Sequence, residues 1–250
     1  MKSAALRVNQ LTYGYRAPLF EPLTFCCQKG EIWAVLGRNG LGKSTLLDTL
    51  TGTLPALGGC VENAGGIGIV AQHCQLPFPY TVSDVVLMGR AQHVKLFAQP
   101  SLQDQQRATQ ALEQLNIAQL ASRSFSSLSG GQQQLVMIAR SLVTECQMLL
   151  LDEPCSALDL ANQQVVLQLI SDLAHQQGCS ILFSTHDPLH ALQIATHTLL
   201  LLPEGEWRAG PTNSIVTEEN LFLAYGLPLR KLSVENHHTP FIAPLFSIRR

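Results

Sequence analysis

Residues 37–44 read Gly37-Arg38-Asn39-Gly40-Leu41-Gly42-Lys43-Ser44, directly after the apolar run Ile32-Trp33-Ala34-Val35-Leu36. A helical pattern begins at Ser44 and ends near Leu50, so the glycine-rich stretch joins a predicted strand to a predicted helix. Glycine lets the backbone turn tightly, and a helix start presents N–H groups and a partial positive charge to an anion. A glycine-rich turn without a ligand is the alternative, but the strand and helix on either side indicate a phosphate-binding loop.

The side chains of this loop suit a nucleoside triphosphate with its magnesium ion. Lys43 can reach the β- and γ-phosphates, and the Ser44 hydroxyl can ligate Mg²⁺. The loop therefore predicts a nucleotide-binding protein. The residues expected to contact the nucleotide are Gly37, Asn39, Gly40, Gly42, Lys43, Ser44 and Thr45.

Acidic and histidine side chains end two further apolar runs. Asp152 and Glu153 follow residues 149–151, and His186 follows residues 181–185. Neighbouring strand residues point to opposite sides, so one acid can serve a metal while the other polarises a water molecule. The carboxyl ends of parallel strands gather active-site groups, which favours His186 as a third member. The alternatives are two exposed acids and a core histidine bonded to the backbone.

Length and composition allow one domain and argue against nucleic acid as the partner. The chain has 250 residues, of which 46% are hydrophobic, so it can bury a full core. Its formal net charge is −2, which gives no basic field for a phosphate backbone. Charged residues make up 14%, against about 25% in an average soluble domain, so we expect partners to cover part of the surface.

No segment suggests a membrane span or a secretory signal. Apolar runs stay well below the roughly 20 residues that cross a bilayer, and the N-terminus lacks an apolar leader. The 7 cysteines are odd in number and show no metal-ligand spacing, which suits reduced thiols. We therefore expect a cytosolic protein.

Apolar periodicity predicts an α/β protein with a helical insertion. Short apolar pieces over 5–33 suggest an antiparallel β flank, and further strands are predicted at 65–70, 148–151, 179–184 and 199–202. Helices are predicted around 108–115 and at 132–143, 161–177 and 218–225. We divide the chain into a domain over 1–225, with its core at 1–80 and 147–225 and a helical lobe at about 81–146, and a C-terminal tail at 226–250.

The string Leu128-Ser129-Gly130-Gly131-Gln132 narrows the class, because phosphate-loop proteins in general lack it. The chain resembles the ABC-type ATPases, which carry matching features in the same order. In this chain they are Tyr15, the loop at 37–44, Gln72, the string at 128–132, residues 149–154, Ser156-Ala157-Leu158-Asp159 and His186. The resemblance runs from about Leu6 to Leu202 and implies a P-loop NTPase (RecA-like) core with an antiparallel β flank and a helical signature subdomain.

The same resemblance implies a role for each of these residues. Lys43, Glu153 and His186 are expected to be catalytic, and Ser44, Gln72 and Asp152 to hold Mg²⁺ beside ATP. Tyr15 is expected to stack on adenine, with a core position as its alternative. Asp159 is also expected at the nucleotide. The residues expected to bind the nucleotide of a second copy are Ser129, Gly130, Gly131 and Gln132. A chain with one copy of each motif is therefore expected to form a head-to-tail homodimer around two ATP molecules.

The stretch from Gln72 to Arg90 is similar to the ATPases of bacterial importers for iron chelates, vitamin B12 and related metal compounds. Residues 127–132 and 157–163 are similar to molybdate importers of the B12-importer type. Apolar and aromatic side chains beside Gln72 suit a groove for a helix of a polytopic membrane permease. The resemblance implies a peripheral subunit at the cytoplasmic face of the inner membrane, served indirectly by a periplasmic or surface substrate-binding protein. A soluble ABC ATPase of cluster assembly is the alternative.

Four positions depart from the family pattern. Gln133 and Leu135 stand where arginines are frequent, Ala71 stands where proline is frequent, and Cys155 stands where threonine or serine is usual. None of them removes an expected phosphate or metal contact. Cys155 would make the protein thiol-sensitive if it were accessible, whereas a buried cysteine would be inert.

Overall fold

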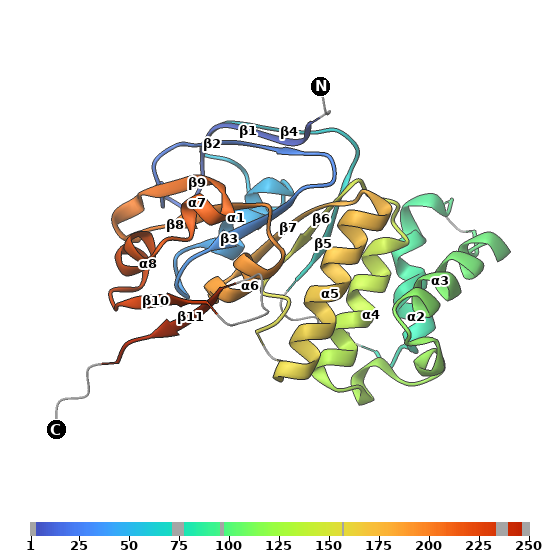
Figure 1. Cartoon of the computed structure of the whole chain (residues 1–250). Coiled ribbons are helices and arrows are strands. Elements are labelled where there is room, and N and C mark those ends of the chain that lie inside the picture. Colours follow the sequence, from blue (N-terminus) through green and yellow to red (C-terminus); the bar gives the residue numbers. More distant parts are fainter. Residues whose placement is uncertain (1–3, 72–77, 96–97, 157, 234–239, 247–250) are drawn as a thin grey trace.

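The computed structural model describes residues 4–71, 78–95, 98–156, 158–233 and 240–246 (Figure 1). Within these residues a six-stranded sheet has the order β5-β6-β7-β3-β8-β9, and all neighbours are parallel except β8 and β9. The strands are β3 (Ile32–Leu36), β5 (Ile67–Val70), β6 (Met148–Leu151), β7 (Ser180–Thr185), β8 (His197–Leu201) and β9 (Trp207–Pro211). This sheet confirms the predicted α/β class.

The central strands are apolar along their whole length because both faces of the sheet are covered. Successive residues of β3 alternate between two hydrophobic cores: Ile32 and Leu36 belong to one, and Trp33 and Val35 belong to the other. Continuous apolar runs therefore read correctly as strands of a parallel sheet.

The second core is closed by helix α1 (Lys43–Leu50) and by an antiparallel sheet of order β2-β1-β4. Its strands are β1 (Ala4–Thr12), β2 (Leu23–Gln28) and β4 (Gly58–Asn63). The predicted flank is thus confirmed, but it ends at Gln28, since residues 32–36 belong to the parallel sheet. Strand β4 was not predicted, because its residues are exposed or half-buried and lack an apolar alternation.

The first core extends into a helical lobe, seen at the right of Figure 1. Its elements are α2 (Val82–Leu87), η1 (Met88–His93), α3 (Leu102–Gln114), η2 (Ala118–Leu120), η3 (Phe125–Ser127) and α4 (Gly130–Leu142). Helices α2 and α3 begin with reciprocal capping boxes, Thr81 with Asp84 and Ser101 with Asp104. The hydrogen bonds from Ser101, followed by those from Arg90, lower the pKa of Asp104 to about 2.

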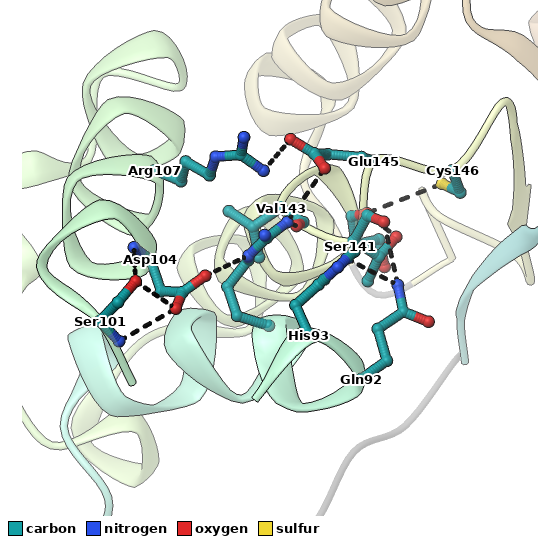
Figure 2. Close-up of polar contacts among 11 residues, drawn as sticks. Gln92, His93, Ser101, Asp104, Arg107, Ser141, Val143, Glu145 and Cys146 are labelled. Carbon is teal, nitrogen blue, oxygen red and sulfur yellow. Dashed lines mark hydrogen bonds and ion pairs between the residues drawn. The ribbon is translucent and has the colours of Figure 1, made fainter. Parts of the chain in front are cut away.

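Arg90 ties three segments of this lobe together, and Figure 2 shows the groups around it. Its buried side chain donates from Nε to Asp104 Oδ1 at 2.8 Å and from Nη1 to Val143 O at 2.7 Å. Glu145 Oε2 lies 3.3 Å from the same Nη1, while Arg107 pairs with Oε1. The guanidinium therefore joins η1 to the start of α3 and to the segment that follows α4.

The remaining helices cover the sheet and lead to the C-terminus. They are α5 (Leu160–Gln177), α6 (Pro188–Ile194), η4 (Pro203–Gly205), α7 (Thr212–Ile215) and α8 (Glu218–Tyr225). Residues 226–250, predicted as a tail, contain two antiparallel strands, β10 (Leu229–Leu232) and β11 (Phe241–Pro244). Among the described residues, no helix has the length and apolarity that a bilayer crossing requires.

Candidate nucleotide site

The phosphate loop has the backbone that its glycines predict. Gly40 and Gly42 both have a φ of 82°, in the left-handed region that favours glycine. A Cβ on Gly42 would also lie 2.7 Å from Leu19 Cδ1. Helix α1 starts directly after this glycine, so its first N–H groups lack intrahelical partners and face the loop. The observed loop therefore fits a phosphate group, which is what the sequence predicts.

Three predicted catalytic side chains come together at the carboxyl ends of β3, β6 and β7. Lys43 Nζ lies 3.1 Å from Glu153 Oε1, and His186 Nδ1 lies 3.5 Å from Glu153 Oε2. Lys43 is buried and also donates to Gly37 O at 2.9 Å. His186 follows β7, as predicted, and its side chain is 45% exposed, so an incoming group can reach it. We call these three residues the Lys43–Glu153–His186 cluster.

Glu153 is held in an unusual conformation by its neighbours. Its φ is 44°, which is costly for a residue with a Cβ and is typical of positions fixed by a functional constraint. Its N–H donates to Ser184 Oγ at 2.8 Å, and Ser184 Oγ donates to Asp152 Oδ1 at 2.6 Å. Ser184 was not predicted as a site residue. The available signal was a hydroxyl that follows the apolar run 181–183 in a fully buried strand.

The residues present fit a hydrated magnesium ion, whose preferred ligands are oxygens. Asp152 is buried behind Glu153, and Ser44 is exposed on the first turn of α1. Asp48 lies one turn further along α1, and burial and then the charge of Asp152 raise its pKa. Two neighbouring carboxylates of this kind attract a cation. Asp48 is a residue of the candidate metal site that the sequence did not indicate. Gln72 lies outside the described residues.

The two tyrosines near the loop have opposite environments. Tyr13 is fully buried and stacks on Phe20 with 5.9 Å between ring centroids. Tyr15 is 73% exposed. The alternative of a core position for Tyr15 is therefore wrong, because Tyr13 takes that place. Stacking of Tyr15 on adenine stays a prediction.

The signature string forms the start of helix α4. Ser129 is the N-cap, and its Oγ accepts from Gln132 N at 3.4 Å while Gln132 Oε1 accepts from Ser129 N at 3.3 Å. Ser129 and Gly130 are exposed. A Cβ on Gly131 would lie 3.3 Å from Leu158 Cδ2, so α4 packs closely against the segment before α5. These residues do not contact the Lys43–Glu153–His186 cluster in any bond found among the described residues.

Two residues next to these motifs have roles that the sequence did not indicate. Gln133 Nε2 donates to Phe125 O at 3.2 Å and to Leu128 O at 3.4 Å, which fixes the loop before α4. Asp159 caps helix α5, because its Oδ1 accepts from Asn162 N at 2.8 Å. The contact of Asp159 with nucleotide stays a prediction.

Cys155 lines a small cavity of about 60 Å³ beside Glu153 and His186. Its side chain is buried, and burial raises the pKa of the thiol to about 12. A thiol that stays protonated is a poor nucleophile. The structure therefore favours the inert cysteine over the thiol-sensitive one.

Comparisons with known proteins agree with this geometry. A family model described as ABC transporter matches residues 20–156, which include the phosphate loop, the signature string and Glu153. The molybdate import ATP-binding protein MolC of Haemophilus influenzae is 49% identical over 227 residues, covering 90% of this chain and 89% of that protein. The ferric enterobactin transport ATP-binding protein FepC of Escherichia coli is 36% identical over 257 residues, covering 97% and 94%.

A solved structure of the same kind covers nearly the whole chain. It is a chain of a metal-chelate type ABC transporter in an inward-facing conformation, with 46% identity, a TM-score of 0.93 and 98% of each chain covered. Because the family model, full-length relatives and the fold all coincide with the phosphate loop and the signature helix, this chain belongs to the ABC transporter family.

Proposed function

We propose that this chain is the ATP-hydrolysing subunit that powers a bacterial importer of a metal chelate or a metal oxyanion. The observation that carries the proposal is the Lys43–Glu153–His186 cluster, which places an ammonium, a carboxylate and an imidazole beside the phosphate loop. The names of MolC and FepC support the cargo class, since one is a molybdate importer protein and the other serves ferric enterobactin.

Each member of the cluster has a separate task in phosphoryl transfer. The loop N–H groups and Lys43 bind the β- and γ-phosphates, and Glu153 polarises the attacking water. His186 donates a hydrogen bond to the γ-phosphate, which its exposed side chain can reach. When bound, Mg²⁺ would neutralise phosphate charge, held by Ser44, Asp152 and Gln72.

Two copies of the chain complete each nucleotide site. Ser129 and Gly130 begin an exposed helix N-terminus that is suited to an anion, but they lie apart from the chain's own cluster. In a head-to-tail homodimer each signature helix would cover the γ-phosphate on the other copy. Closure on ATP and release after hydrolysis would then convert chemistry into motion.

A groove in the helical lobe supports contact with a membrane permease. It has a volume of about 640 Å³ and lies between α2, η1 and the segment that follows η1. Its lining is mainly apolar, which suits a helix of the partner, and comprises Tyr80, Asp84, Leu87, Met88, Ala91, Val94, Lys95, Ala98 and Pro100. The Arg90 bonds to Asp104 and Val143 hold this wall to the signature helix, so a force on the groove would reach α4.

Co-expression with the polytopic permease of a metal-chelate or molybdate importer tests the proposal. We expect the chain to co-purify with that polytopic protein in detergent, and the complex to hydrolyse ATP faster when a loaded binding protein is added. Comparison of binding proteins loaded with molybdate or with an iron chelate would identify the cargo. An active ATPase that binds no membrane protein would instead support the soluble alternative.

A further inference from the structure

Tyr225, at the end of helix α8, reaches the loop that carries His186. Its hydroxyl donates a hydrogen bond to the backbone carbonyl of His186 at 2.8 Å. The two residues are 39 positions apart, and none of the motifs found in the sequence includes Tyr225. The contact therefore connects the C-terminal part of the chain to a member of the Lys43–Glu153–His186 cluster.

The C-terminal elements hold this tyrosine in place. Helix α8 ends at Gly226, whose φ of 72° turns the chain sharply, and Leu229 of β10 is buried directly afterwards. Strand β11 pairs with β10, and Leu245 N donates to Pro228 O at 2.9 Å. Strand β11 also packs against α6, the helix that follows His186. Burial raises the pKa of Tyr225, so its hydroxyl stays protonated and able to donate.

The peptide that follows His186 has a second anchor. Thr185 Oγ1 accepts from Asp187 N at 3.1 Å and lies 3.1 Å from His190 Nδ1. The Asp187 N–H and the His186 carbonyl belong to one peptide unit, so Thr185 holds one edge of that peptide and Tyr225 holds the other. The imidazole is 45% exposed, so its position depends on how firmly its own backbone is held.

We propose that Tyr225 is a positioning residue that orients the His186 peptide so that the imidazole meets the γ-phosphate and Glu153. This inference rests on the proposed function, because it assigns His186 to the γ-phosphate. It extends the catalytic apparatus to α8, β10 and β11, which act through the backbone of His186.

The test removes one oxygen atom at a time. Tyr225→Phe keeps the ring and its packing but deletes the bond to His186. Tyr13→Phe is the matched control, because Tyr13 Oη is buried without a hydrogen-bond partner among the described residues. We expect Tyr225→Phe to lower kcat about three- to tenfold, as the loss of one hydrogen bond predicts, with KM for ATP within twofold. Tyr13→Phe should keep both values, and both variants should unfold at nearly the parent temperature.

The His186→Ala background separates the inference from the function it rests on. Single-turnover phosphate release is measured for His186→Ala with and without Tyr225→Phe. Equal rates for these two proteins, together with a slow Tyr225→Phe single variant, would support positioning through His186. A slow His186→Ala with an unchanged Tyr225→Phe would overturn the inference alone. An equal further loss in the His186→Ala background would also overturn it. Full activity of His186→Ala would reject the role of His186 and the inference with it.

Discussion

The two glycine-rich helix starts of this chain each present backbone N–H groups that suit an anion, but their surroundings are opposite. Helix α1 begins inside a network, because Lys43 binds loop carbonyls and Glu153 while His186 approaches the same carboxylate. Helix α4 begins in an exposed position, where the side chains of Ser129 and Gln132 bond to each other's backbone N–H in the capping box. One chain thus assembles the phosphate loop with the Lys43–Glu153–His186 cluster, and it exposes the signature helix that would complete the site of another copy.

Replacing the central carboxylate tests the Lys43–Glu153–His186 cluster and should have the largest effect on ATP hydrolysis. In Glu153→Gln the shape is kept, but the group that polarises water and pairs with Lys43 loses its charge. We expect steady-state ATP hydrolysis to fall by more than about 100-fold, the usual worth of a general base, while ATP binding persists. Phosphate release and equilibrium binding of a fluorescent ATP analogue measure the two quantities.

Glu113→Gln is the control for this change, because Glu113 is exposed on α3, away from the cluster. It should hydrolyse ATP at the parent rate. Turnover of Glu153→Gln within a few-fold of the parent would reject Glu153 as the catalytic carboxylate.

Blocking the exposed start of the signature helix tests whether it binds the nucleotide of a facing copy. Ser129→Arg adds bulk where the phosphate of a facing copy is expected, so ATP-driven dimers should disappear while each monomer still binds nucleotide. The variant is best made in the slow Glu153→Gln background, in which ATP stays uncleaved during sedimentation or light scattering. Thr109→Arg adds the same charge to an exposed position of α3 and should leave the dimer intact.

A Glu153→Gln protein that stays monomeric when saturated with ATP would contradict the two-copy site altogether. A Ser129→Arg protein that still dimerises would contradict the placement of the signature helix over the facing nucleotide.

A smaller effect should follow from loosening the loop before α4. Gln133→Ala removes two hydrogen bonds, to Phe125 O and Leu128 O, and each is worth about 1 kcal/mol. We expect ATP-driven dimerisation to weaken about three- to tenfold, whereas hydrolysis at saturating protein concentration stays near the parent value. The measurement is the dimer dissociation constant by analytical ultracentrifugation.

The neighbouring Gln134 supplies the control. Its Nε2 is buried without a hydrogen-bond partner among the described residues, so Gln134→Ala removes an amide of the same kind whose Nε2 donates no such bond. If both variants weaken the dimer equally, helix packing and not the loop contacts of Gln133 would be responsible.

Sequence patterns predicted the residues at the ends of strands, but not the residues that act through distant contacts. The edge that gathers Lys43, Glu153 and His186 could be predicted, because apolar runs mark strands and a parallel sheet brings their carboxyl ends together. Ser184 and Tyr225 could not, since each acts through a contact that depends on the register or on distant packing. The same reason explains β10 and β11, which are short and partly exposed and so lack the continuous apolar run that marked β3.

The smallest predicted effect is a pH dependence of stability that His190 on α6 gives to the region beside the cluster and not to the start of α4. Burial lowers the pKa of this histidine, although Asp187 opposes the shift, so the folded chain holds it neutral. The unfolded chain takes up a proton as the pH falls below about 6.5, and it then binds more protons than the folded chain. Stability should therefore be complete above about pH 6.5 and decline below it, by at most about 1.4 kcal/mol per pH unit for this single group.

Urea unfolding at several pH values, with His190→Gln as the comparison, measures this contribution. The glutamine variant should lose part of the acid sensitivity of the parent, because it has no group to protonate. Hydrogen exchange should show that acid loosens α6 and the Thr185 contact before α4, whose first turn carries no titratable side chain. Equal acid sensitivity of parent and variant would mean that His190 keeps its ordinary pKa in the folded chain. The acid sensitivity of the region around the Lys43–Glu153–His186 cluster would then not come from this histidine.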